Sequence, residues 1–435
     1  MAWYVTLAIG LAILVGLFMT GAPIFLAFLI IIVSGVLFIL GDAGFGMVVN
    51  SIYQTATTGS LGTVPLFVLL GEILFRSGCM EVLLNSIDKL IGRMRGRQYV
   101  LSVSISTVLG ALSGSAIAVG AMLSRSLLPI MRARGYDTQL SMGTILGGAC
   151  LAPIIPPSIL AIIIGTLADV SIASLLMAGV IPGLILATLF IAYCLIKVRL
   201  NPSLAPADED MSAVPWRDKL KAIGGLIPFS IVIFMVMGLI LLGVATPSES
   251  AATGVLGAII TAGYYRKLSW RMLWEATGEA ALLSAVILII FASAVMFTQL
   301  LAFTGATAGL TQAVTALDAN RWVLFFAMMA LPFILCMFID QLGLMLVVIP
   351  VYVPILKVLE FDPVWFWLIF LVNITLGAIT PPFGYVIFAV KAATPDVTMG
   401  QIFRACWPFV WITVFGMLIF TVFPDTVTVL PRLFD

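Results

Sequence analysis

The sequence is a succession of long apolar segments separated by short polar ones, and this pattern limits its possible folds more than any other feature. Hydrophobic residues make up 62% of the 435 positions and charged residues only 9%, whereas soluble domains are roughly 45–50% apolar and about 25% charged. In hydrocarbon every backbone N–H and C=O needs a partner within the protein, and an α-helix provides these partners within one segment. The sequence therefore predicts an all-α polytopic membrane protein in a lipid bilayer.

Composition also excludes several kinds of chemistry. The chain has no histidine, so we expect no Ser-His-Asp or Cys-His catalysis, no histidine-ligated metal and no imidazole proton relay. Its 21 Lys and Arg residues balance 20 Asp and Glu without a basic block, which argues against a nucleic-acid partner. The cysteines are Cys79, Cys150, Cys194, Cys336 and Cys406. They form no CxxC pair, so we expect their side chains to be buried among apolar residues. We expect the protein not to be an enzyme and to have no cofactor.

The predicted crossings follow from the lengths of the apolar segments and the positions of Lys and Arg. A spanning helix needs about 20 apolar residues. The candidate spans are 2–19, 23–40, 61–77, 138–168, 174–196, 222–243, 251–265, 280–303, 363–390 and 405–423. This path places 17 basic residues in the cytoplasm and three outside, in agreement with the positive-inside rule. Both termini are then periplasmic, and the first span, which lacks a basic leader, is a retained helix rather than a signal peptide.

Two further segments have lengths that fit neither one crossing nor two. Thirty-four residues separate Arg97 from Arg132, and both of these residues are predicted to be cytoplasmic. The chain between them therefore enters the membrane and turns back, as a re-entrant helical hairpin over about 98–135 with its tip near 112–115. A second hairpin, over about 322–360, is predicted to open to the outside.

Both halves of the chain thus have the same predicted order of three spans, a hairpin and two spans. The first repeat covers 1–200, a polar cytoplasmic linker covers 201–221, and the second repeat covers 222–435. The first repeat begins outside and the second begins inside, so the two have inverted topology. Inverted repeats are typical of secondary transporters.

A double proline follows each hairpin tip at a similar distance. The pair at 156–157 begins 43 residues after Ser113, and the pair at 381–382 begins 41 residues after Asp340. Adjacent prolines break a helix, and in hydrocarbon such a break is tolerated where it lines a protein or ion cavity. Unwound carbonyls are good ligands for a hard cation, and the new helix N-terminus attracts an anion. A single such pair is usually a structural kink, whereas two matched pairs favour two broken helices that build a binding site.

The hairpin tips carry polar groups that complement the breaks. Residues 113–115 read Ser-Gly-Ser, and Asp340 is an acid deep in an apolar segment. We expect Asp340 to face a cavity or an ion, because a carboxylate in contact with lipid is costly. Arg125 lies in the returning arm of the first hairpin, and the sequence allows two roles for it. It either pairs with an anionic substrate or reaches the cytoplasmic interface.

Segments 112–118, 128–137 and 155–158 resemble the large membrane subunit of tripartite ATP-independent periplasmic (TRAP) transporters. Segments 243–252 and 377–384 are similar to second-half signatures of the same family, and the resemblance covers essentially the whole chain. It implies an elevator-type transporter of the bacterial inner membrane that imports a small carboxylated solute, such as a C4-dicarboxylate or sialic acid, with sodium as the coupling ion. It also implies two partners, a periplasmic substrate-binding protein and a separate small four-helix membrane subunit.

The resemblance further implies two pseudo-symmetric sodium sites with the solute carboxylate between them. The sodium-site residues are Ser113, Gly114, Ser115, Ala149, Pro153, Asp340, Gly343, Gly377 and Thr380. The solute-site residues are Ser115, Pro157, Ser158, Pro382, Gly384 and Arg125. Pro153 departs from the family's pattern, in which a smaller residue precedes the break.

Three other functions remain as alternatives. A sodium/dicarboxylate symporter of the same broad fold would work without a binding protein, and it would show Ser-Asn-Thr at both tips. A channel would not need inverted repeats with matched breaks. An intramembrane protease would need histidine or a GxGD acid motif, and neither is present.

Overall fold

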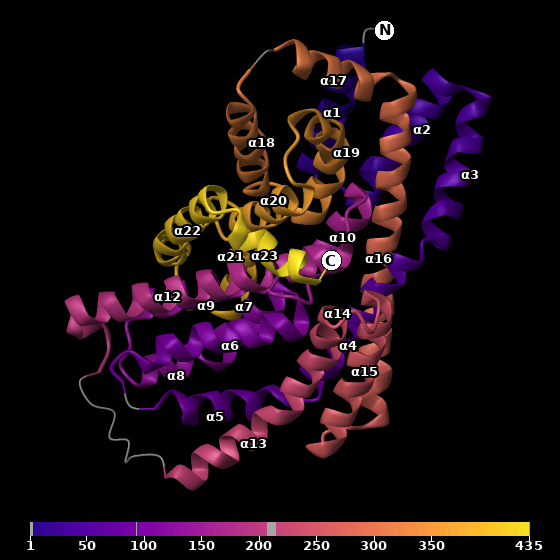
Figure 1. The fold of residues 1–435 in the computed structure, drawn as a ribbon. Helices are drawn as coiled ribbons and strands as arrows, with labels where there is room; N and C mark the ends of the chain where they lie inside the picture. The colour runs from indigo at the N-terminus through magenta and orange to yellow at the C-terminus, as the bar shows by residue number, and fades with distance from the viewer. Residues whose placement is uncertain (1–2, 93, 207–214, 318, 435) are drawn as a thin grey trace.

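The structure, a computed structural model, describes residues 3–92, 94–206, 215–317 and 319–434. Within these ranges the regular secondary structure is entirely helical. Seven of the described helices are long and apolar enough to cross a membrane, which confirms the predicted class of polytopic membrane protein (Figure 1). The middle of the predicted linker, 207–214, lies outside the described residues.

The first half of the chain contains one helix that the apolar pattern does not predict. Its helices are α1 (Trp3–Met19), α2 (Ile24–Gly35), η1 (Val36–Leu40), α3 (Asp42–Thr57), η2 (Gly59–Gly62), α4 (Thr63–Arg76), α5 (Met80–Ile91), α6 (Arg97–Ser113), α7 (Ala116–Ser126), α8 (Leu128–Ala133), α9 (Thr138–Leu151), α10 (Ile159–Ala168), α11 (Ile172–Ala178), α12 (Val180–Leu200) and η3 (Pro202–Leu204). The unpredicted helix is α3, which carries too many polar residues to stand out as a span. It packs along α16, and Tyr53 is exposed.

The second half begins inside the predicted linker and ends with a helix that was not predicted. Its helices are α13 (Trp216–Ile233), η4 (Phe234–Gly238), α14 (Leu239–Leu241), α15 (Pro247–Tyr264), α16 (Trp270–Phe303), α17 (Ala306–Ala316), α18 (Arg321–Cys336), α19 (Gln341–Leu359), α20 (Pro363–Gly377), α21 (Tyr385–Ala393), α22 (Met399–Val422) and α23 (Asp425–Phe434). The predicted span 280–303 is longer than expected, because α16 begins ten residues earlier, after the cap at Ser269.

Both turns and both helix breaks lie where the sequence predicts them. A tight turn at Gly114 joins α6 to α7, and residues 337–340 join α18 to α19. Residues 152–158 interrupt the helix between α9 and α10, and residues 378–384 interrupt it between α20 and α21. Re-entry of the two hairpins into the membrane stays a prediction.

Helices of the two halves pack against one another around these turns and breaks. Helix α7 lies against α21, α9 against α22, and α10 against α19. A second group of helices, α4, α13, α15 and α16, lies along one side of the molecule, where α4 packs on α15 and α16, and α13 packs on α15 (Figure 1). We call this second group the side wall. The turns and breaks are therefore gathered in one bundle that borders the side wall.

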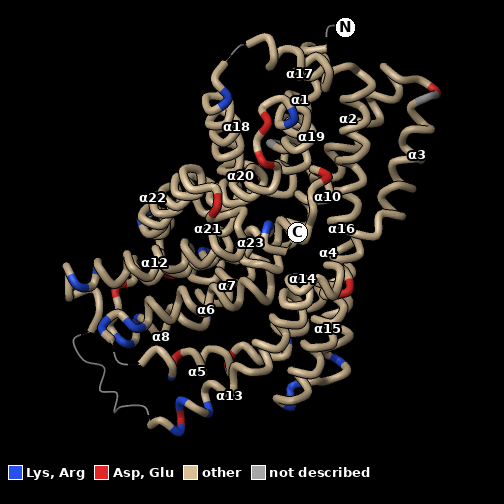
Figure 2. The backbone as a smooth tube through the Cα atoms, in the orientation of Figure 1, with Lys and Arg blue, Asp and Glu red and all other residues tan. Residues whose placement is uncertain are grey.

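Lys and Arg residues gather at one end of the molecule. Figure 2 shows them around α8, the end of α12, the start of α13 and the connection between α15 and α16. At this end Arg132 on α8 forms an ion pair with Asp396, which follows α21. The hydrogen bond from Arg132 lowers the pKa of the Asp396 carboxyl. This pair is a polar link between the two halves of the chain.

Close packing of the first hairpin on the first break depends on glycine. A Cβ at Gly110 would lie 2.7 Å from the Cα of Ala152. Gly114 adopts a φ of +61°, and a Cβ there would lie 2.8 Å from the carbonyl oxygen of Pro157. Only glycine lets the backbones of α6 and the break approach this closely.

We predict that Gly110→Ala destabilises the protein, because the added methyl group overlaps the Ala152 backbone. Overpacking of this kind costs about 1–3 kcal/mol, so thermal unfolding of the purified protein should shift down by several degrees. Gly224→Ala is the matched control, because a Cβ there meets nothing within 4 Å. An equal shift for the two variants would contradict this account of the packing.

Candidate functional site

The first tip is a polar turn with two serine hydroxyls. Ser113 Oγ donates a hydrogen bond to the Leu109 carbonyl at 2.8 Å and accepts one from the Ser115 N–H at 3.5 Å, which leaves one lone pair of the oxygen for a further partner. Ser115 is the N-cap of α7, where its hydroxyl accepts from the Ala118 N–H at 3.3 Å. Hydroxyl N-caps of this kind satisfy a backbone donor at the start of a helix.

The first break is held by the hydroxyl of a buried serine. Ser158 is 1% exposed and caps α10 by accepting from the Ala161 N–H at 3.1 Å. The same hydroxyl donates to the carbonyl of Pro153, across the break. The freed carbonyl of Pro153 is thereby paired within the protein. Ala149 lies buried in the last turn of α9.

The second tip places its acid at a helix N-terminus. Asp340 is the N-cap of α19 and accepts from the Leu342 N–H at 2.9 Å. The partial positive charge of a helix N-terminus stabilises a carboxylate in this position. Asp340 forms no ion pair with any Lys or Arg in the part of the chain that the structure describes.

Gln341 ties the second tip to both sides of the second break. Its side-chain amide donates to the Ile374 carbonyl at 2.8 Å, and its amide oxygen accepts from the hydroxyl of Tyr385. Gln341 is 3% exposed, so both ends of its side chain need these partners. Sequence reasoning assigned Gln341 no role, although an amide within an apolar segment signals a buried polar contact.

The second break contains a buried threonine directly before its proline pair. Thr380 is fully buried and donates to the Leu376 carbonyl at 2.7 Å. Its backbone carbonyl accepts from the Gly384 N–H at 3.2 Å, which closes the loop of the break. A Cβ at Gly384 would lie 2.7 Å from the Ala378 carbonyl oxygen, so the tight loop excludes a larger residue.

Both tips line one cavity of about 310 Å³, which we call the tip cavity. The first half supplies Ser113, Gly114, Ser115 and Pro153, and the second half supplies Asp340, Gln341 and Tyr385. The side wall closes it with residues of α4 and α16, including Glu72, whose carboxylate pairs with Arg76 at 2.7 Å. Residues that lie more than 200 positions apart in the sequence therefore meet at one site.

The other predicted site residues divide into three groups. Seven are buried and are not among the described residues that line the tip cavity, namely Ala149, Pro157, Ser158, Gly343, Gly377, Thr380 and Gly384. Pro382 is exposed on the second break. Arg125 is exposed at the last turn of α7 and is not among the described residues that line the tip cavity, so this arrangement gives no support to an ion pair between Arg125 and the substrate.

The tip cavity has the chemistry of a binding site. Its polar groups are hydroxyls, an amide, two carboxylates and the N-termini of α7 and α19. No group of three or more Cys, Asp or Glu that could hold a metal ion is found among the described residues. The five cysteines are free and buried, as predicted.

The whole chain is similar to known transport proteins. Residues 11–426 match the tripartite ATP-independent periplasmic transporter family, DctM component. The 2,3-diketo-L-gulonate TRAP transporter large permease protein YiaN of Escherichia coli is 29% identical over 380 residues, covering 87% of this chain and 88% of that protein. The ectoine TRAP transporter large permease protein TeaC of Halomonas elongata is 27% identical over 420 residues, covering 96% and 97%.

A solved structure shares the fold. The crystal structure of the Alcanivorax borkumensis YdaH transporter aligns with a TM-score of 0.64 at 14% identity, and the alignment covers 89% of this chain and 91% of that one. The family match extends over both tips, both breaks and the side wall. The chain is therefore a membrane transport protein and not an enzyme, and it belongs to the DctM component family of the tripartite ATP-independent periplasmic transporters.

Proposed function

We propose that this chain is the large transmembrane subunit of a sodium-coupled importer, that sodium binds at the tips and breaks beside the tip cavity, and that this cavity holds a small carboxylated solute. The observation that carries the proposal is the convergence of the two tips, with residues next to both breaks, around one cavity. The relatives carry names that refer to 2,3-diketo-L-gulonate and ectoine, both small organic solutes with a carboxyl group. A solute of this kind fits a cavity of about 310 Å³.

The proposed sodium ligands are hydroxyl, carboxylate and backbone carbonyl oxygens, each of which keeps at least one lone pair beyond its local hydrogen bonds. Ser113 and Thr380 each donate their hydroxyl proton to a carbonyl four residues earlier, at 2.8 and 2.7 Å. Each hydroxyl oxygen therefore keeps at least one lone pair for a hard cation, which prefers oxygen ligands. The first site adds Gly114, Ser115, Ala149 and Pro153, and the second adds Asp340, Gly343 and Gly377. Ser113 supplies its hydroxyl from the first tip, and Thr380 supplies its hydroxyl from within the second break.

The solute carboxylate would lie between the tips, near the N-termini of α7 and α10 and the residues Ser115, Pro157, Ser158, Pro382 and Gly384. Helix N-termini favour an anion. Asp340 and Glu72 oppose one, because both are acids in the lining. Bound sodium offsets this repulsion, since an unpaired buried charge costs several kcal/mol. Sodium and solute therefore bind together, which is the physical basis of coupling.

The proposed mechanism is an elevator movement of the tip bundle along the side wall. Inverted repeats with two re-entrant hairpins would give the bundle two equivalent positions, one that opens the site to each side of the membrane. The gathering of basic residues at one end (Figure 2) supports a cytoplasmic assignment for that end and hence periplasmic termini in the bacterial inner membrane.

We also propose two partners, a small four-helix membrane subunit and a periplasmic substrate-binding protein. Uptake in the absence of a binding protein would instead identify an independent symporter.

Replacement of the Thr380 hydroxyl tests the second sodium site. We predict that Thr380→Ala raises the sodium concentration for half-maximal uptake about tenfold, because loss of one oxygen ligand costs about 1.4 kcal/mol. The measurement is solute uptake by proteoliposomes that contain the complete transporter, over a range of sodium concentrations with potassium as replacement.

Thr413→Ala is the matched control for this prediction. Thr413 is fully buried and donates to the Phe409 carbonyl at 2.8 Å, so it has the same local bonding in α22. We expect its sodium dependence to equal that of the unmodified protein. The proposal fails if uptake runs at full rate in potassium, or if Thr380→Ala leaves the sodium dependence unchanged.

A reversible cross-link tests movement between the tip and the side wall. A Cβ at Gly71 of α4 would lie 3.3 Å from the Cα of Ser113, which suits a disulfide between Gly71→Cys and Ser113→Cys. We predict that oxidation of this double variant stops uptake and that a reducing agent restores the rate of the reduced protein. Because the native cysteines are buried, the single variants serve as controls for oxidation alone. Unchanged uptake by the fully cross-linked protein would rule out this movement.

A further inference from the structure

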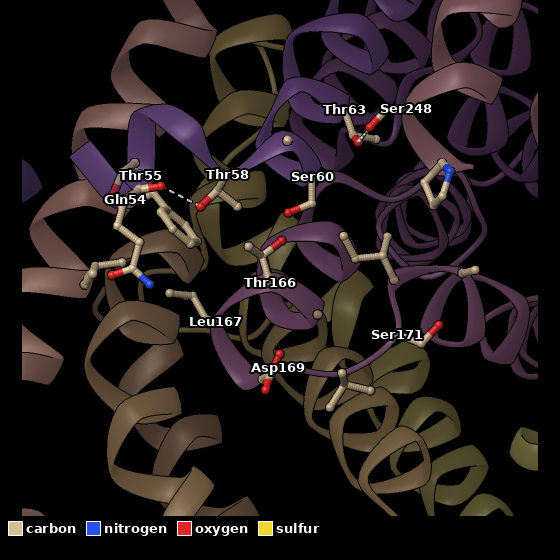
Figure 3. Close-up of a pocket in the computed structure, with 18 of the residues that line it drawn as sticks. Gln54, Thr55, Thr58, Ser60, Thr63, Thr166, Leu167, Asp169, Ser171 and Ser248 are labelled. Atoms are coloured by element: carbon tan, nitrogen blue, oxygen red, sulfur yellow. Dashed lines mark hydrogen bonds between the residues drawn. The ribbon is translucent and has the colours of Figure 1, made fainter. Parts of the chain in front are cut away.

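A second and larger cavity lies beyond the far end of α10. Its volume is about 940 Å³. We call it the polar cavity, and Figure 3 shows hydroxyl and amide side chains from α3, η2, α10 and the chain that follows α10 pointing into it. The lining residues that matter for its chemistry are Gln54, Ser60, Thr166, Asp169, Thr298 and Gln299.

The polar cavity and the tip cavity lie along the same helices. On α10, Ile159 and Leu160 line the tip cavity, whereas Thr166 and Leu167 line the polar cavity. On α16 the tip cavity touches Leu283 and Ile287, and the polar cavity touches residues 291–299. The nearest lining residues on α10, Leu160 and Gly165, are five positions apart, so about 8 Å of helix separates the two cavities. The polar cavity thus continues the path of the tip cavity, on the side away from the basic end (Figure 2).

The hydrogen bonds around the polar cavity make its wall rich in acceptors. Thr166 donates its hydroxyl proton to the Ile162 carbonyl at 2.8 Å, and Thr298 donates to the Ala294 carbonyl at 2.9 Å. Both threonine oxygens can then only accept a bond from a ligand. Gln299 accepts from Ser51 at 2.8 Å through its amide oxygen, which leaves its NH₂ group as a donor.

The charge of the polar cavity further restricts the ligand. Asp169 is the one charged residue among the described residues that line it, and its side chain is exposed. No Lys or Arg that could pair with an anion is found among the described residues of the lining. A dicarboxylate in this cavity would lie near the negative charge of Asp169 and next to hydrogen-bond acceptors, and both contacts would cost binding free energy. A solute with several O–H or N–H groups would find partners for each of them.

We propose that the polar cavity is a second solute-binding site on the route to the tip cavity. The solute class it takes is a hydroxylated or zwitterionic carboxylate with at most one net negative charge, rather than a dicarboxylate. This inference rests on the proposed function, because it assumes that a solute passes between the two cavities.

Protection of an introduced cysteine tests the proposal. Ser60→Cys places a thiol in the polar cavity of the complete transporter, while the native cysteines are buried. The rate of labelling by a polar maleimide is measured with gluconate, a hydroxylated monocarboxylate, and with succinate, a dicarboxylate. Gluconate should slow labelling about tenfold at a concentration ten times its Kd. Succinate at the same concentration should leave the rate unchanged.

Two sets of variants in the Ser60→Cys protein identify the cause of the protection. Thr166→Val with Thr298→Val removes two acceptors at nearly constant volume and should weaken gluconate protection about tenfold. Thr188→Val is the matched control, because Thr188 has the same bond to its own helix, to Leu184 at 2.8 Å, on an exposed face of α12. Asp169→Lys supplies the missing cation and should let succinate protect the thiol.

Several results would overturn the inference. These are absence of gluconate protection, equal protection by succinate, or equal losses in the Thr188→Val control and the double variant. If sodium-dependent uptake persists while protection is absent, only the second site is refuted. Uptake at full rate in potassium would refute the proposed function whatever the labelling shows.

Discussion

The architecture of the site depends on how the protein satisfies backbone groups that proline pairs set free inside apolar surroundings. A break in a membrane helix is stable only when neighbouring groups replace its lost hydrogen bonds. At the first break the Ser158 hydroxyl bonds to the freed Pro153 carbonyl. At the second break the Val386 N–H bonds to the freed Ala378 carbonyl, and the side chain of Gln341 adds a bond to the Ile374 carbonyl one turn earlier. These polar side chains must lie close to the breaks, so each break brings a small polar cluster into the interior of the bundle.

A similar requirement holds each tip against the break of its own half. Gln341 belongs to the second tip, and it reaches Ile374 and Tyr385 on the two sides of the second break. In the first half, glycines at 110 and 114 let the hairpin rest directly on the chain around the first break. The tips therefore cannot lie far from the breaks. Because α7 packs on α21 and α10 on α19, the two tip-and-break pairs come together around one cavity.

Much of this arrangement is predictable from the sequence because its signals are local. Proline pairs mark the breaks, a Ser-Gly-Ser turn marks the first tip, and an acid in an apolar segment marks the second. The role of Gln341 could not be predicted, because its partners lie 33 and 44 residues away in the chain. Helix α3 could not be predicted from hydropathy, because it packs on α16 and does not form a long apolar segment of its own.

The polar cavity could not be predicted from the sequence, for a similar reason. Its wall combines single hydroxyls and amides from several distant segments, including Gln54, Thr166 and Gln299. Each of these residues alone is an ordinary polar side chain near a helix end or within a helix. Only the packing of α3 and α10 beside α16 turns them into one surface. The polar cavity is therefore a product of the tertiary structure.

Hydrogen exchange of the tips and breaks, measured by mass spectrometry, tests the central claim most directly. If the four segments 109–118, 152–158, 336–344 and 378–384 form two sodium sites, sodium should slow amide exchange in all four relative to potassium. Segments of the side wall such as 247–264 should exchange equally in the two salts. Slowing confined to one half of the chain, or none in any of the four segments, would contradict the account.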